Sequence, residues 1–168
     1  MATSLAATLT LNLRHTYTNA LDLTTPTDEL GTNGVWGDSL ANGTGVDQAN
    51  YVWHDTRSLT ATSETLDLST GLTDPLGVPV AFTGIKAIAI WVTTTTVGVS
   101  LSVGAAVANA WSGMFANSSD ILTIGPDARF LWWCPGAAST VDATHKNLKL
   151  DAGAGTLTYN IVIYGIKA

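Results

Sequence analysis

Charge is scarce in this chain. Only 12% of its 168 residues are charged, against about 25% in an average soluble domain. Seven Lys and Arg residues stand against thirteen Asp and Glu residues, and the formal net charge is -6. A surface this poor in basic groups does not suit a phosphate backbone, so we expect no nucleic-acid partner.

Cysteine and long apolar runs are also missing. The single cysteine, Cys134, cannot form an internal disulfide, and no Cys/His group has the spacing of a metal site. No run of about 18 apolar residues is free of polar interruption, so we expect no transmembrane helix and no membrane partner. Hydrophobic residues still make up 46% of the chain, which excludes an intrinsically disordered protein.

Threonine is what the chain has in excess, with 26 residues. Thr, Val and Ile are stiff at χ1 and suit a pleated strand better than a helix. Several segments alternate apolar and polar residues with period two, the pattern of a strand with one covered face. The predicted strands are 8–14, 51–60, 62–69, 84–93, 97–103, 121–124, 128–134, 147–150 and 157–165. Both faces of the last one are apolar towards its end, which predicts a central strand or one covered by a neighbouring subunit.

Turn chemistry separates these strands. Gly125-Pro126-Asp127 between two apolar runs predicts a turn, because Pro fixes φ and Asp bonds nearby backbone. The short linker 94–96 predicts a hairpin between 84–93 and 97–103. Residues 24–50 show almost no periodicity and are predicted to form a long ordered loop or arm, too long for an ordinary connection.

The strands and turns together predict an all-β protein. Eight or nine short strands with Gly-, Pro- and Thr-rich turns favour an antiparallel β-sandwich, and at this length a jelly roll is the natural choice. No repeat or shift in composition marks a second domain. We therefore predict one domain over 1–168, with a first strand and extended arm or loop in 1–50 and the core sandwich in 51–168.

Residues able to carry chemistry do not form a recognisable motif. His54 and Asp55 are adjacent on a predicted strand and therefore point to opposite faces. Cys134 follows two tryptophans, an apolar setting that favours a buried, inert thiol. The loop acids leave a structural calcium ion open, although none follows the calcium-loop pattern. We predict no catalytic, cofactor or metal site, and hence no enzyme.

Tryptophan is the more informative residue type, with six copies. Trp132 and Trp133 must face opposite sides of their strand, so one can fill the core while the other faces outward. Because Trp is enriched at the centre of interfaces, so many copies with so few charges favour a large protein–protein surface. Core packing is the plainer interpretation of any one of them. The predicted interface residues are Leu9, Leu21, Leu23, Leu30, Trp36, Trp111 and Phe115.

Five stretches carry a resemblance to a known group. They are NALDLTTPTDEL (19–30), NGTGVDQANYVWHDTRSLTATSETLDLS (42–69), DPLGVPVAFTGIKAIAI (74–90), DILTIGPDARFLW (120–132) and NLKLDAGAGTLTYNIVIYG (147–165). In pattern and phrase, most of the chain resembles small all-β structural proteins of tailed bacteriophages, such as capsid decoration (cement) proteins. This group offers no catalytic signature that could be carried over. Residues 92–119 are the segment in which the resemblance is weakest.

The resemblance implies a function and partners. The chain would be a non-enzymatic virion protein, made in the host cytoplasm and placed on the capsid surface. It would bind the major capsid protein and itself, with a homotrimer as the natural assembly. A receptor- or carbohydrate-binding module of the tail or fibre is the alternative, with Trp36 or Trp111 exposed in a groove. A hydrolase on a β-sandwich is the third hypothesis, and it requires titratable residues clustered in a pocket.

Overall fold

Two antiparallel sheets form the body of the molecule. The computed structural model describes residues 4–18, 22–30, 35–74 and 76–167, and none of these forms a helix. One sheet contains β6 (Tyr51–Thr60), β10 (Phe82–Val92), β13 (Arg129–Trp133) and β16 (Thr156–Lys167), in the order β13-β10-β16-β6. The other contains β7 (Ser63–Asp67), β11 (Leu101–Gly104), β12 (Ile121–Ile124) and β15 (Asn147–Asp151), in the order β12-β11-β15-β7. The prediction of an all-β antiparallel sandwich is therefore confirmed.

The core lies between these two sheets. In β16 the residues at every second position from Leu157 to Gly165 are buried, and β10 and β6 flank this strand on its two sides. Burial at alternate positions follows from the period of the strand, which sends neighbouring side chains to opposite faces. The prediction of a central strand is confirmed. Short strands complete the body: β8 (Leu72–Thr73) pairs with β9 (Pro79–Val80), and β14 (Ser139–Thr140) pairs with the start of β10.

One predicted connection is wrong. Residues 94–96 do not close a hairpin, because β10 and β11 belong to different sheets. The Thr93 amide donates to the Thr158 carbonyl, and the Thr158 amide donates to Oγ1 of Thr94, so this segment continues alongside β16. The chain then turns at Gly98, whose φ of +85° favours glycine, and crosses to the second sheet. The predicted strand 97–103 is correspondingly shortened to β11.

A second correction concerns the segment predicted as a loop. Residues 24–50 contain β3 (Thr27–Leu30), β4 (Val35–Asn42) and the short β5 (Gln48–Ala49). β4 pairs antiparallel with β1 (Ala7–Asn12), and β3 pairs with β2 (His15–Thr18). The alternation of β4 is masked by weak strand formers such as Gly37 and Asp38, so its strand comes from pairing with β1 rather than from its own propensity.

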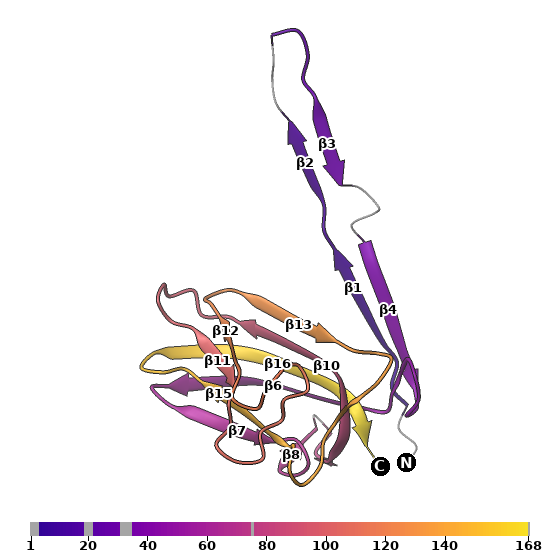
Figure 1. Cartoon of the computed structure of the whole chain (residues 1–168), viewed down its shortest axis with the longest axis vertical. Helices are drawn as coiled ribbons and strands as arrows, with labels where there is room; N and C mark the ends of the chain where they lie inside the picture. Colours follow the sequence, from indigo (N-terminus) through magenta and orange to yellow (C-terminus); the bar gives the residue numbers. More distant parts are fainter. Residues whose placement is uncertain (1–3, 19–21, 31–34, 75, 168) are drawn as a thin grey trace.

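These four strands make a long hairpin that runs away from the sandwich (Figure 1). We call residues 5–42 the hairpin arm. The first strand of the chain thus pairs within its own arm. The root of the arm continues through β5, which lies parallel to the end of β4, directly into β6 of the body.

Candidate functional site

The hairpin arm has one polar and one apolar face near its root. Cross-strand partners share a face, and on one face these pairs are Thr8 with Ser39 and Thr10 with Gly37. On the other face the pairs are Ala7 with Leu40, Leu9 with Asp38 and Leu11 with Trp36. The arm is therefore an amphipathic ribbon, although only two strands wide.

The apolar face becomes more exposed with distance from the root. Leu40 is 1% exposed, and Leu9 is half-buried. Further out, Leu11 is 51% exposed and Trp36 54%, and Leu13, just beyond the end of β1, is 56% exposed. The arm therefore moves away from the body along its length, and its outer apolar side chains are not covered by the body as Leu40 is.

A groove of about 450 Å³ lies between this face and the outer surface of the first sheet. Leu9 and Leu11 line it from β1. Ala89 and Trp91 of β10, Leu131 of β13 and Val162 of β16 line it from the body. The body thus presents apolar side chains on the face that points away from its core, where a solvated sheet normally carries polar ones.

One cation lies among the groove residues. The guanidinium of Arg129 lies 4.4 Å from the ring centre of Trp91, a cation–π arrangement. Its Nη2 is also 3.7 Å from Oδ1 of Asp127. The Arg129 side chain is nevertheless well exposed, so the groove combines an apolar lining with an accessible positive charge.

The root of the arm is fixed to the body by polar bonds. Nε1 of Trp133 donates to Oδ2 of Asp38 at 3.2 Å. Trp132, its neighbour, packs from the other side of the strand against Trp111, with ring centres 5.7 Å apart. The two adjacent tryptophans therefore face opposite sides, as predicted, and Trp133 meets the chain's own arm.

Lys86 is the second anchor at the root. This residue of β10 is buried, and its Nζ donates to the carbonyls of Gly45, Pro135 and Gly136 at 3.1, 2.6 and 3.4 Å. The Asp47 amide also donates to the Pro135 carbonyl. Because a buried amino group needs hydrogen-bond acceptors, these carbonyls make the burial of Lys86 tolerable. Lys86 thus ties the loop after β4 to the loop after β13.

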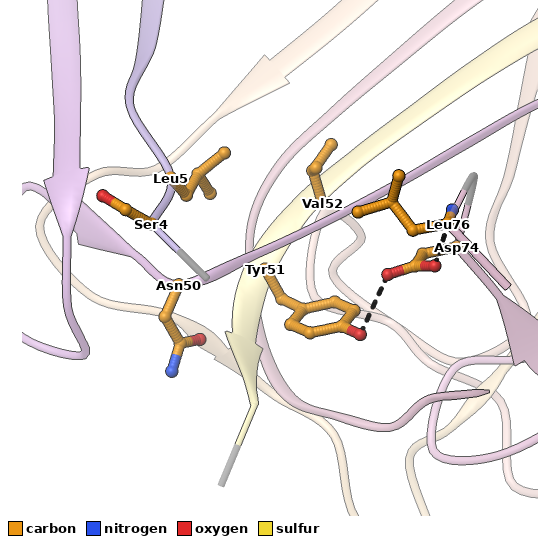
Figure 2. A pocket seen from close by; sticks show the side chains of 7 residues that line it. All are labelled: Ser4, Leu5, Asn50, Tyr51, Val52, Asp74 and Leu76. Carbon is orange, nitrogen blue, oxygen red and sulfur yellow. Dashed lines mark hydrogen bonds between the residues drawn. The ribbon is translucent and has the colours of Figure 1, made fainter. Parts of the chain in front are cut away.

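A smaller pocket of about 280 Å³ lies beside the same root (Figure 2). Leu5 lines it from the start of the arm, the preceding Ser4 lies beside it, and Tyr51 lines it from β6. The Tyr51 hydroxyl donates to Oδ2 of Asp74 at 3.1 Å, while the amides of Leu76 and Val78 donate to Oδ1. Asp74 therefore closes its own loop and braces Tyr51.

These contacts move the titration of both groups. The hydrogen bond from the Val78 amide, followed by those from Leu76 and Tyr51, lowers the pKa of Asp74 despite some desolvation. Desolvation and the bond to Asp74 raise the pKa of Tyr51. Both directions keep the groups in the states that hydrogen-bond one another at neutral pH, which is a structural role.

A polar cluster links the two sheets at another edge. The Tyr159 hydroxyl donates to Oε1 of Glu64, whose Oε2 lies 2.9 Å from Nη1 of Arg57. Burial, reinforced by Glu64, raises the pKa of Tyr159. Asp55 belongs to this cluster through Arg57, whereas His54 is exposed on the outer face. His54 and Asp55 lie on opposite faces, as predicted, and the cluster braces the sandwich.

The predicted interface residues fall into different places. Leu9 lines the groove, Trp36 lies on the exposed part of the ribbon, and Leu23 is 98% exposed in the turn beyond β2. Leu30 of β3 pairs through its backbone with His15 of β2, and the Leu30 side chain lies outside the described part. Leu21 lies outside the described residues. Phe115 is half-buried against the core.

The prediction that Trp111 is an interface residue is wrong. Its side chain is 1% exposed and packed in the core, so it is not a surface anchor. Cys134 is half-buried rather than fully buried, and its Sγ contacts the Ala137 carbonyl at 3.2 Å.

Sequence reasoning missed Trp91 and Leu131 as groove residues. Their placement on alternate positions of two apolar strands was visible, but which face would be covered was not.

Comparison of the chain with protein-family models, with curated proteins and with solved structures finds no match. Within the described part of the chain, no helix meets the length and apolarity needed to cross a bilayer. The same part contains no group of three or more His, Cys, Asp or Glu side chains arranged to hold a metal ion. The groove under the hairpin arm, with its apolar lining and the Arg129 cation, is the candidate functional site.

Proposed function

We propose that this chain is a structural protein of a bacteriophage virion, a capsid decoration protein that binds the major capsid protein and itself. The observation that carries the proposal is the amphipathic hairpin arm on a β-sandwich, with apolar side chains left uncovered. Large exposed apolar surfaces are typical of protein–protein contacts. The protein would be made in the host cytoplasm, act on the capsid surface and catalyse no reaction.

The strand order supports this proposal. From β6 to β16, the eight main strands pair first with last, second with seventh, third with sixth and fourth with fifth. The third of these strands, β10, also pairs with the eighth, β16. Together these pairings match the connectivity of a jelly roll. Jelly rolls occur in viral capsid proteins and also in lectins. The fold therefore supports a capsid role by analogy, and the role itself is inferred from the arm and the groove.

The outer surface of the sandwich also suits a packed position. On β6 and β16, Thr56 donates to Asn160 and Ser58 hydrogen-bonds Thr158 across the strands. Uncharged hydroxyl and amide groups of this kind can exchange hydrogen bonds with a partner surface without the desolvation cost of burying charges. We infer that this scarcity of charge reflects contact with a shell and with neighbouring copies.

A carbohydrate- or receptor-binding module of the tail remains the second candidate. Trp36, exposed on the arm, favours it, because an accessible indole can stack on a sugar ring. Trp111, the other residue on which this hypothesis relied, is buried. Glycan binding that is abolished by Trp36→Ala would favour this alternative over the capsid proposal.

The direct test is the copy number and position of the chain in purified particles. We expect hundreds of copies, labelled over the head in electron micrographs and quantified by mass spectrometry against the major capsid protein. About a dozen copies or fewer, confined to the tail, would contradict the capsid proposal.

A second test addresses the tip of the arm. Thr18 and Thr27 lie opposite each other, so replacing 19–26 by Asn-Gly closes the hairpin in register and removes Leu21 and Leu23. We expect an unchanged circular dichroism spectrum and lower occupancy on particles that lack the wild-type protein. Replacing only Leu23 by the similarly apolar Met is the matched control and should preserve occupancy. Full occupancy of the shortened variant would exclude the tip as a shell contact.

A further inference from the structure

We propose that the groove under the hairpin arm is a self-association site that takes the arm of a second copy of this chain. Two elements would meet in this contact. One is the ridge, which we define as Leu11, Leu13 and Trp36 on the arm. The other is the floor, which we define as Ala89, Trp91, Leu131 and Val162 on the outer face of the first sheet.

The ridge and the floor are both under-covered in the single chain. Each ridge residue is more than half exposed, while Trp91 is 41% exposed and Leu131 40%. Leu11 reaches the groove, yet half of its surface still faces water. The chain's own arm therefore covers the floor only in part, and the groove stays open to a further apolar segment.

The exposed area is sufficient for association. Taking about 200 Å² for a fully exposed large side chain, the three ridge residues together with Trp91 and Leu131 of the floor present roughly 500 Å² of mostly apolar surface. A patch of that size lies at the upper end of what a monomeric protein leaves uncovered, about 300–600 Å². A reciprocal contact that buries the patch on both partners removes roughly 1,000 Å² from water, about the total area that a specific interface requires.

The shape of the patch identifies the occupant. A projecting ribbon and an open groove of matching polarity lie side by side on the same molecule, so two copies can interlock by placing each ridge on the other's floor. Reciprocal exchange gives a two-fold dimer, and exchange in one direction gives a ring when the rotation between copies closes. A second copy therefore satisfies both exposed elements at once, whereas an unrelated partner would need to match both.

Charge adds a preference for the distal part of a neighbouring arm. Asp28 and Glu29 of β3 are exposed, and Arg129 is an accessible cation at the groove. A neighbour's arm that lies along the groove can bring these carboxylates towards Arg129. Exposed charge pairs contribute little affinity but favour one orientation over others.

The inference builds on the proposed function, which includes self-association, but its test needs no capsid. The full-length chain is purified and its mass is measured by sedimentation and light scattering over a range of concentrations. We expect a dimer or a closed ring. Leu11→Asp on the ridge and Leu131→Asp on the floor should each weaken association by at least about tenfold.

The matched control is Thr10→Asp, which adds the same charge to the same strand on its polar face and should leave the assembly unchanged. Circular dichroism and urea unfolding confirm that each variant is folded, which is expected because neither Leu11 nor Leu131 belongs to the buried core. A monomer at all concentrations, or an assembly that both groove variants preserve, would overturn the inference.

A cross-linking experiment identifies which surfaces meet. In a Cys134→Ser background, Leu13→Cys chains are mixed with Leu131→Cys chains and oxidised. A mixed disulfide between the two chains is expected, and Thr10→Cys in place of Leu13→Cys should give none. Equal yields from both mixtures would contradict the ridge-on-floor contact. Neither result depends on particle copy number, so the self-association site and the capsid role can fail separately.

Discussion

The hairpin arm and the sandwich are built from the same kind of sequence. β1 reads Ala-Thr-Leu-Thr-Leu-Asn and β15 reads Asn-Leu-Lys-Leu-Asp, and both alternate leucine with polar residues. Leu148 and Leu150 in β15 are fully buried, whereas Leu11 in β1 is half exposed. Alternation therefore predicts a strand with an apolar face, but a second layer of structure decides whether that face is covered.

The largest expected effect tests this contrast directly. Leu148→Ala removes a side chain from the closed core and should lower the free energy of unfolding by about 2–5 kcal/mol. Leu11→Ala should lower it by less than about 1 kcal/mol, because half of that side chain is already in water. Urea unfolding of the two variants at a concentration where the protein is monomeric measures both. Equal losses would show that the arm packs against the body as tightly as the sheets pack together.

The next effect concerns the junction between the two regions. Lys86→Met leaves the three carbonyls at the root without their donor and should cost about 2–3 kcal/mol. Hydrogen exchange of the Asp47 amide, which bonds Pro135, should accelerate as the root loosens. Lys149→Met is the control, since Lys149 pairs with Asp151 near the surface and should cost no more than about 1 kcal/mol. Unchanged exchange at Asp47 would refute the anchoring role of Lys86.

The smallest effect is a dependence on pH that belongs to the body alone. Burial acts to raise the pKa of Asp67, but hydrogen bonds from Lys146 and Ser69 outweigh it and lower the pKa from 3.8 to about 2. Because the folded state favours the charged carboxylate, its contribution is complete at neutral pH and is lost as pH falls from about 4 to about 2. Asp67→Asn should therefore lower stability by about 1–2 kcal/mol at pH 7.

Measurement of unfolding free energy at pH 7 and near pH 2 checks this. The difference between wild type and Asp67→Asn should shrink at the acidic end. A difference that is constant across this range would assign the effect of the substitution to packing rather than to the Lys146 pair.

The sequence allowed prediction of the strands that carry their own periodicity. The bounds of β6 match the predicted segment 51–60, and β16, whose two faces are both apolar towards its end, is the central strand that the sequence predicted. β4 was missed because its residues favour turns and its structure depends on β1. The hairpin predicted at 94–96 was wrong because hydrogen bonds to Thr158, distant in sequence, direct the chain elsewhere.

The candidate site was predictable only in part. Leu9 and Trp36 were chosen as apolar residues in a region without a core of its own, and both lie on the amphipathic ribbon. Trp111 was misplaced because an indole between two loops can serve a core as well as a surface. Lys86 carried no signal, since a lysine on an alternating strand is usually exposed and its carbonyl partners come from loops far along the chain.

The pairing of the first main strand, β6, with the last, β16, has a consequence for folding during synthesis. Thr56 of β6 bonds Asn160 of β16, 104 residues later. On the ribosome, the hairpin arm needs only neighbouring residues to pair, while β6 must wait until β16 has been synthesised. Until β16 is available, the nascent polypeptide therefore exposes the apolar side chains of the arm together with an unpaired β6 edge, and in that interval it is most prone to aggregation.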